Sequence, residues 1–215
     1  DCQRAVFLCP DRTRSASDQE ITMITKPATE YVDVWYRRQA PSDIPLHPTL
    51  QGRVEADICI IGGGLAGLTT AHDLAKAGKK VVLVEARRIG WGASGRNGGF
   101  VSPGYALGYE GISARVGPVA AHELFRMSVE GMQIVADNIR DLDISAANPC
   151  AGILGAVRYD AGRGLADHRD WLAKEFNYEV AHLDRAALAE HLTSPRYHQA
   201  LHDQNAFHFD PLAYC

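Results

Sequence analysis

The run ADICIIGGGLAGL, residues 56–68, constrains the fold more than any other part of the chain. Its apolar first half is typical of a buried strand, and three glycines follow at the spacing Gly62-x-Gly64-x-x-Gly67. Gly62 permits a tight turn, Gly64 lets a pyrophosphate approach the backbone, and Gly67 allows a helix to lie close to the strand. The free N–H groups at the start of that helix, residues 65–77, favour phosphate at the same place. The run therefore predicts a dinucleotide-binding turn.

A second apolar run, KVVLVE at residues 80–85, completes this unit. It reads as an interior strand of a parallel sheet. The run ends in Glu85, 23 residues after Gly62, where a carboxylate can accept hydrogen bonds from both ribose hydroxyls. The same charge disfavours a 2′-phosphorylated cofactor. Up to this point the cofactor could be NAD or FAD.

The next stretch, ARRIGWGASGRNGG at residues 86–99, favours FAD. After Glu85, a simple NAD domain would soon enter a crossover helix and a third strand. Here small residues that permit close backbone approach alternate with the polar Ser94, Arg96 and Asn97. That composition suits a long ligand whose far end lies across the loop, and a flexible loop is the alternative. The five glycines are Gly90, Gly92, Gly95, Gly98 and Gly99.

The predicted fold class is α/β, with an incomplete Rossmann-like FAD-binding domain and part of an α+β substrate domain. Residues 1–22 lack periodicity and are expected to be a disordered or non-native tail. A proline-containing arm follows over 23–55, with a possible short helix at 31–39. The first part of the FAD-binding domain is expected over 56–105, and a helical segment with the start of the substrate domain over 106–215. Within that last part, helices are predicted at 118–142 and 162–176 and from Asp184 to 191, and strands at 152–159 and 178–183.

The composition of the chain argues against several classes of protein. The chain has 215 residues and a formal net charge of −4, so nothing attracts it to nucleic acid over long range. Five scattered cysteines without a C-x-x-C pair indicate reduced thiols and a cytoplasmic location. No apolar run approaches the length of a transmembrane segment.

Two other chemistries do not fit the sequence. Gly92-Ala93-Ser94-Gly95-Arg96 approaches the G-x-S-x-G elbow of serine hydrolases, but Arg96 stands where glycine is required. Nine histidines suggest a metal site, yet pairs such as His198 with His202, or His208 with Asp210, do not reach three or four ligands. No metal is predicted.

The segment that begins at Glu85 resembles the corresponding segment of a known family. Glu85-Ala-Arg followed by GWGASGRNGG is similar to the FAD-binding segment of flavin oxidoreductases in the D-amino acid oxidase superfamily, most closely the γ-glutamylputrescine oxidoreductase branch. The likeness extends from YVDVWYRR near residue 31 to HFDPLAYC at the end. Its motifs are specific over residues 56–99 and loose after about residue 105.

The resemblance implies a set of FAD-binding residues. The glycines of the turn would frame the pyrophosphate, Glu85 would hold the adenosine ribose, and Arg87 would lie near the adenine. For Arg87 and Arg88 a solvated surface pair is an equal alternative, and Trp91 is expected to serve in packing. The full implied set is Gly62, Gly64, Leu65, Ala66, Gly67, Glu85, Ala86, Arg87, Ala93, Ser94, Asn97, Gly98 and Gly99.

The implied reaction is oxidation of a C–N bond in an amine or amino acid. Hydride would pass to the flavin, the imine product would hydrolyse, and O2 would reoxidise the cofactor, releasing peroxide. A γ-glutamylated polyamine is the first expected substrate, and no catalytic side chain can be assigned. The alternatives are a D-amino acid or sarcosine-type dehydrogenase that passes electrons to a quinone, a flavin-binding assembly factor without turnover, and a non-functional fragment.

In this superfamily the flavin domain is discontinuous, because the chain leaves for a substrate domain and later returns. Here the sequence stops at Cys215, where that return should begin, so we expect roughly the N-terminal half of a longer enzyme. Two parallel strands without their partners leave unpaired edges. We therefore expect the 215-residue chain by itself to be marginally folded and to bind FAD weakly or not at all.

Overall fold

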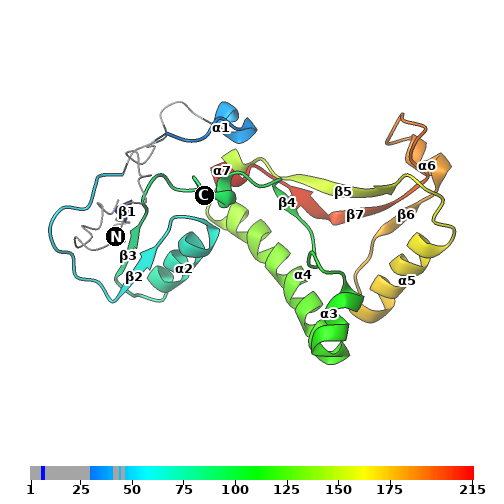
Figure 1. Ribbon diagram of the computed structural model, residues 1–215, viewed down its shortest axis with the longest axis horizontal. Coiled ribbons are helices and arrows are strands. Elements are labelled where there is room, and N and C mark those ends of the chain that lie inside the picture. Colours follow the sequence, from blue (N-terminus) through cyan, green and yellow to red (C-terminus); the bar gives the residue numbers. More distant parts are fainter. Residues whose placement is uncertain (1–5, 8–29, 41–43, 45–46) are drawn as a thin grey trace, which may run out of the picture. The chain divides into compact units, whose positions relative to one another are not determined.

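A computed structural model describes residues 6–7, 30–40, 44 and 47–215 (Figure 1). The chain divides into two compact units. The first contains the residues up to Gly98 together with Asp210–Cys215, and the second contains Gly99–Phe209. The last six residues thus return to the first unit. The mixed α/β architecture expected from the sequence is confirmed.

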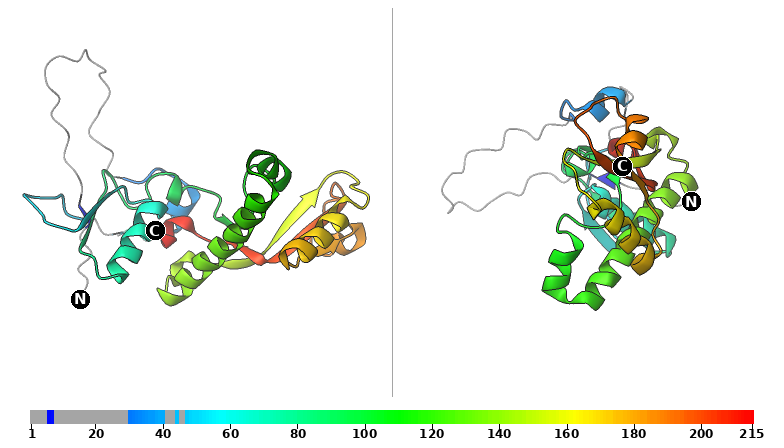
Figure 2. Two further views of the ribbon diagram at one scale, coloured as in Figure 1. Left: turned by 90° about the horizontal axis from the view of Figure 1, so that it is seen from below. Right: turned by 90° about the vertical axis from the view of Figure 1, so that its right-hand side faces the viewer.

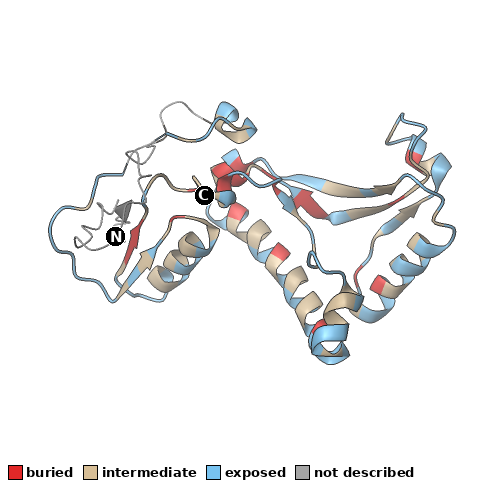
Figure 3. Cartoon of the chain, in the orientation of Figure 1, coloured by how far each residue is buried: buried red, intermediate tan, exposed pale blue. Residues whose placement is uncertain are grey.

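The first unit is built on a parallel sheet with strand order β1-β3-β2. Strand β2 (Ile58–Ile61) lies beside β3 (Val81–Val84), with Ile58 opposite Val81 and Ile61 opposite Val84. The apolar side chains of β3 are the most buried part of this sheet (Figure 3). On β2, by contrast, Cys59 and Ile61 are exposed. Both strands were predicted, and both are confirmed.

Helix α2 (Leu65–Lys76) follows β2 and packs against β3. It ends where the sequence predicts, because Gly78 adopts a φ of +79° that a residue with a side chain rarely reaches. The N–H of Lys79 donates to the carbonyl of Leu74 at 3.0 Å, which satisfies a carbonyl at the helix end. The β2–α2–β3 order is therefore the expected βαβ unit.

Strand β1 (Val6–Phe7) departs from the expectation of a structureless tail at those two residues. It pairs in parallel with β3, with Val6 opposite Leu83. The physical reason is that β2 occupies only one edge of β3, so the other edge offers unpaired backbone groups. The rest of the expected tail, and part of the arm that follows it, lie outside the described residues.

Three short elements complete the first unit. Helix α1 (Trp35–Gln39) confirms the short helix expected in the arm. The 3-10 turn η1 (Ala93–Gly95) lies in the glycine-rich loop. Helix α7 (Pro211–Tyr214) packs against η1 and is capped by Asp210, whose Oδ1 accepts from two backbone N–H groups at 2.9 and 3.0 Å. We use "the arm" below for residues 30–40 and 44.

The second unit is an antiparallel sheet with helices (Figure 2). Strand β7 (Gln199–His208) is central and pairs with β4 (Phe100–Val101), β5 (Cys150–Val157) and β6 (Ala181–Leu183). The remaining elements are α3 (Tyr109–Val116), α4 (Pro118–Asp141), η2 (Ser145–Ala147), α5 (Gly164–Phe176) and α6 (Arg185–Ala189).

The predicted helices and strands of this unit are confirmed within a few residues. Asp184 caps α6 as expected, since its Oδ1 accepts from the N–H of Ala187 at 2.9 Å. The sequence did not predict β7, α3 or α7. Within the described ranges, none of the helices is both long enough and apolar enough to cross a bilayer.

Aromatic side chains from three helices form a half-buried cluster in this unit. The ring of Phe125 on α4 lies 4.2 Å from that of Phe176, and Trp171 on α5 lies 5.0 Å from the same ring. Tyr109 on α3 meets Trp171 edge to face at 4.9 Å. These contacts tie α3, α4 and α5 together, because offset and edge-to-face ring pairs stabilise beyond the apolar area that they bury.

Tyr178 links this cluster to the sheet and yields a stability prediction. Its side chain is 6% exposed, and its hydroxyl donates to Oδ2 of Asp203 on β7 at 2.7 Å. Replacing Tyr178 with phenylalanine is expected to lower the free energy of unfolding by about 1.5–3 kcal/mol, the range for a hydrogen bond to a charged group. Urea denaturation measures this loss. Tyr159→Phe, at a tyrosine that is 64% exposed, is the control and should change little.

The same hydrogen bond predicts a pH dependence. Burial, followed by the bond to Asp203, raises the pKa of Tyr178 well above its ordinary value. The folded state then holds the hydroxyl proton more tightly than the unfolded state. The stabilisation is therefore complete below about pH 10 and lost as the pH rises further. The difference in stability between the wild type and Tyr178→Phe should be constant from neutral pH to about pH 9 and should shrink above about pH 10.

Candidate functional site

The turn from β2 into α2 has the geometry of a phosphate-binding loop. Gly62 adopts a φ of +108°, and its N–H donates to the carbonyl of Val84 at 2.8 Å, which holds the turn to the end of β3. At Gly67, a Cβ atom would overlap the carbonyl oxygen of Gly62 and touch Ile60. The absence of side chains at Gly62 and Gly67 thus lets the helix start directly against the strand, with its first N–H groups unused by the helix.

Glu85 ties this turn to the loop that follows β3. Its Oε2 accepts from the N–H of Gly63 at 2.7 Å, and its Oε1 accepts from the N–H of Arg87 at 2.8 Å. Each carboxylate oxygen can accept a second hydrogen bond. The carboxylate is therefore fixed in position and still has two acceptor sites for ribose hydroxyls.

Ser94 reaches the start of α2 from 29 residues further along the chain. Helix α2 begins after Gly64, which has no side chain to cap it, and the N–H of Leu65 donates instead to Oγ of Ser94 at 3.0 Å. A Cβ atom at Gly64 would come within 2.8 Å of that same oxygen. The glycine-rich loop and the turn from β2 into α2 are therefore held side by side.

Two glycines of the loop have a different role from the one expected. A Cβ atom at Gly90 would lie 2.9 Å from Cβ of Cys215, and one at Gly95 would lie 2.8 Å from Cδ1 of Leu212. Gly95 would also meet the carbonyl of Gly90. These two positions are glycine because α7 packs on them. Close approach of a ligand is not required to explain them.

Gly63 is a variable position of the motif, and the motif alone therefore does not predict a role for it. Its N–H binds Glu85, its carbonyl accepts from the N–H of Gly90 at 2.8 Å, and a Cβ atom there would overlap Ile89. The run of three consecutive glycines at 62–64 was the signal that could have identified it.

The two arginines after the strand have separate environments. The guanidinium of Arg87 lies 3.6 Å from the ring centre of Trp91, and that of Arg96 lies 4.7 Å from it. The side chain of Arg88 is only 11% exposed and donates to the carbonyl of Ile44 at 3.0 Å. Arg88 is thus not part of a solvated surface pair. For Arg87, contact with the cofactor stays a prediction.

The other predicted residues divide between the two units. Asn97 donates from Nδ2 to the carbonyl of Ser94 at 2.8 Å and so fastens the end of η1. Gly99, with a φ of +69°, is the first residue of the second unit. The first unit brings together all the others: Leu65, Ala66, Ala86, Ala93 and Gly98 with those described above.

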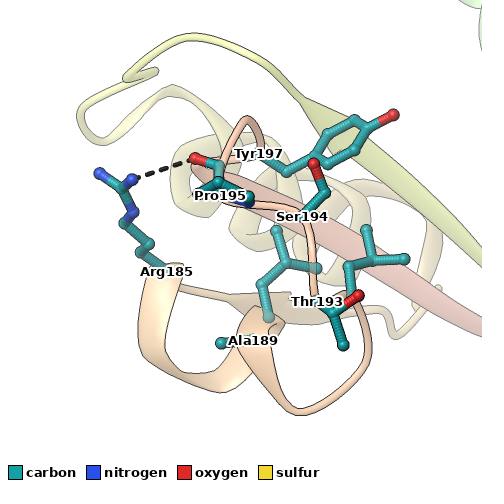
Figure 4. Close-up of a pocket in the computed structure, with 8 residues that line it drawn as sticks. Arg185, Ala189, Thr193, Ser194, Pro195 and Tyr197 are labelled. Atoms are coloured by element: carbon teal, nitrogen blue, oxygen red, sulfur yellow. Dashed lines mark hydrogen bonds between the residues drawn. The ribbon is translucent and has the colours of Figure 1, made fainter.

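A separate pocket lies in the second unit. Its volume is about 420 Å³, and Figure 4 shows Arg185, Ala189, Thr193, Ser194, Pro195 and Tyr197 around it. The guanidinium of Arg185 is engaged with the carbonyl of Pro195 at 3.1 Å. None of the predicted cofactor residues lines this pocket. In the described part of the chain, no group of three or more histidine, cysteine, aspartate or glutamate side chains is arranged to hold a metal ion.

The cap from Ser94 gives a testable prediction. Ser94→Ala removes the acceptor for the Leu65 N–H and should lower the free energy of unfolding by about 0.5–2 kcal/mol, as for other N-cap replacements. Thermal or urea unfolding of the protein without cofactor measures this. Ser94→Thr keeps a hydroxyl and should restore most of the loss. Equal stability of the alanine variant and the wild type would contradict the cap.

Comparison with known proteins identifies the family. The sequence model of the DAO family, described as FAD dependent oxidoreductase, matches residues 57–215. The chain is 34% identical to the probable oxidoreductase OrdL of Haemophilus influenzae and 33% identical to γ-glutamylputrescine oxidoreductase of Escherichia coli. Each match covers 86% of this chain, which spans 43% of the length of either relative.

Solved structures show the same fold. Glycine oxidase of Bacillus cereus matches 74% of this chain and 42% of its own, with a TM-score of 0.53 at 22% identity. L-amino acid deaminase of Proteus vulgaris matches 77% of this chain and 37% of its own, with a TM-score of 0.59 at 18% identity. Because the family model covers well over half of the chain, the chain belongs to the DAO family of FAD-dependent oxidoreductases.

Proposed function

We propose that this protein oxidises the C–N bond of an amine or amino acid with bound FAD. The observation that carries the proposal is the assembled cradle of the first unit, in which Glu85 and Ser94 join the glycine turn to the glycine-rich loop. The substrate class is supported by the name of a relative, γ-glutamylputrescine oxidoreductase, at 33% identity. A γ-glutamylated polyamine is therefore the first substrate to test, with O2 as the acceptor.

Successive groups of residues would bind successive parts of the cofactor. The turn at Gly62, Gly64, Leu65, Ala66 and Gly67 would bind the pyrophosphate through the N–H groups that Val84 and Ser94 do not engage, which are those of Gly64, Ala66 and Gly67. Glu85, flanked by Ala86 and Arg87, would accept hydrogen bonds from the ribose of the adenosine. The loop residues Ala93, Ser94, Asn97 and Gly98 would line the path toward the flavin ring. Bound FAD supplies the two-electron acceptor for the C–N bond, and the protein orients the substrate.

The location is also a proposal. Within the described residues, Cys59, Cys150 and Cys215 are free thiols. Cysteines without a disulfide partner are typical of proteins in a reducing compartment such as the cytoplasm, and this supports the proposal.

The test is anaerobic reduction of the FAD-loaded extended chain, by which we mean this sequence completed to the length of its relatives, since the 215 residues span 43% of them. γ-Glutamylputrescine, putrescine, sarcosine and D-alanine are added in turn while the flavin absorbance is recorded. Bleaching by one of them supports C–N oxidation and identifies the substrate class. Peroxide formed on readmitting O2 favours an oxidase, whereas reoxidation by a quinone alone favours a dehydrogenase. A flavin that no amine reduces would favour the non-catalytic assembly factor.

A further inference from the structure

The arm is fastened to the flavin loop by three long-range hydrogen bonds. The hydroxyl of Tyr31 donates to the carbonyl of Ile89 at 2.8 Å, and Nε1 of Trp91 donates to the carbonyl of Glu30 at 3.0 Å. The third is the bond from the guanidinium of Arg88 to the carbonyl of Ile44. All three join the arm to residues 88–91, the short stretch between Glu85 and Ser94.

Arg88 is the centre of this contact. Its nearly buried guanidinium lies 5.2 Å from the ring centre of Tyr31 and 3.9 Å from a carboxylate oxygen of Glu30. Burial raises the pKa of Tyr31, and the charge of Arg88 works against that rise. A buried cation is costly unless it is paired and hydrogen-bonded. Since the arm supplies these partners, Arg88 and the arm stabilise each other.

The stretch held by the arm has few other means of holding its shape. It contains Gly90, with a φ of +68°, and Gly92 follows directly, so the ordered loop has a high cost in backbone entropy. Besides the packing of α7, the stretch is joined to the turn from β2 into α2 by the bond from the Gly90 N–H to the carbonyl of Gly63 and by the packing of Ile89 on that glycine. A displaced loop would therefore move Ser94 away from the start of α2.

We propose that the arm is a clasp that sets residues 88–91 in the position required for FAD, with Tyr31 and Arg88 as positioning residues. The proposal rests on the FAD-binding residues given under the proposed function. Without the clasp, only a fraction of the protein has the loop in place before the cofactor binds. The apparent dissociation constant for FAD then rises by the inverse of that fraction.

The test compares three variants, each made in the extended chain that is completed to the length of the relatives. Tyr31→Phe removes one hydrogen bond and keeps the ring, while Arg88→Met removes the cation and keeps a side chain of similar length. Arg38→Ala is the matched control, because it breaks an exposed ion pair with Asp33 on the same arm and does not touch the loop. FAD is titrated into each apoprotein, and its dissociation constant is read from the quenching of flavin fluorescence. Hydrogen exchange of the amides of residues 88–91 is followed in parallel.

The expected result is a dissociation constant about fivefold higher for Tyr31→Phe and on the order of a hundredfold higher for Arg88→Met. Loop amides should exchange faster in both apoproteins, and Arg38→Ala should match the wild type. Unchanged affinity in Tyr31→Phe, or an equal loss in Arg38→Ala, would overturn the clasp. If Arg88→Met does not fold, the FAD dissociation constant of Tyr31→Phe alone tests the proposal. A wild-type extended chain that binds no FAD would instead refute the proposed function, and the clasp with it.

Discussion

Gly67→Ala is expected to abolish FAD binding. A methyl group at this position overlaps the carbonyl oxygen of Gly62, a backbone atom that cannot rotate away. Relief requires α2 to move off the end of β2, which displaces the helix N-terminus from the proposed position of the pyrophosphate. The measurement is the FAD content of the purified extended chain, together with titration of its apoprotein; the other FAD titrations use the same extended chain. We expect the affinity to fall by more than a hundredfold, because a backbone overlap costs several kcal/mol.

Gly131→Ala is the control for that substitution. It also changes a helical glycine to alanine, but a Cβ atom at Gly131 on α4 meets nothing within 4 Å. Because alanine is the better helix former, this variant should gain about 1 kcal/mol in stability and retain its FAD. Normal FAD content in Gly67→Ala would show that the helix does not need to approach the strand so closely.

Glu85→Ala is expected to have the second largest effect. The substitution removes both tethers, to the N–H of Gly63 and the N–H of Arg87, and also the proposed ribose acceptor. Each charge-assisted bond contributes about 1.5–3 kcal/mol, so FAD affinity should fall by on the order of a thousandfold. Glu85→Gln retains one acceptor oxygen and should lie between alanine and the wild type. Titration of the apoproteins with FAD measures both.

Glu55→Ala serves as the control for charge. Glu55 has a 79% exposed side chain that lies 3.3 Å from Arg53. Its removal changes the net charge by the same amount and should leave FAD affinity unchanged, because exposed ion pairs contribute little. A Glu85→Ala variant that binds FAD as tightly as Glu55→Ala would show that Glu85 does not contribute to FAD binding.

The sequence predicted the first unit well because each of its signals is local. The apolar runs of β2 and β3, the glycine spacing and the end of α2 at Gly78 each follow from a few neighbouring residues. The position of Glu85 at the end of β3 follows from counting along the same unit. Local patterns suffice here because a βαβ unit is formed by consecutive elements.

Strand β7 shows where local patterns fail. Its sequence, QALHDQNAFH, contains no valine, isoleucine or threonine and would not be read as a strand. It is a strand because β5, β6 and β4 supply partners on both edges, from residues up to about a hundred positions away. Ala200 and Ala206 are fully buried there, so small side chains replace the usual branched ones where the unit is closely packed.

The role of the arm could not be predicted for the same reason. From the sequence, Arg88 is predicted to be half of an exposed basic pair, because no residue near it in sequence indicates a hydrogen-bonding partner. Its environment depends on Tyr31 and Ile44, more than forty residues earlier. Likewise the sequence predicts that Gly90 and Gly95 permit close approach of a ligand. In the structure, Leu212 and Cys215, from the far end of the chain, pack on these two glycines.

The cap that Ser94 provides for α2 also sets an order of events during synthesis. Leu65 is made 29 residues before Ser94, so the nascent helix has no acceptor for that N–H while the intervening chain is added. At ordinary rates of translation this interval is about 1–6 s, far longer than the time in which a helix forms and melts. The segment that becomes α2 therefore fluctuates until the glycine-rich loop arrives. The N-terminus of the helix and the loop beside it then become ordered together.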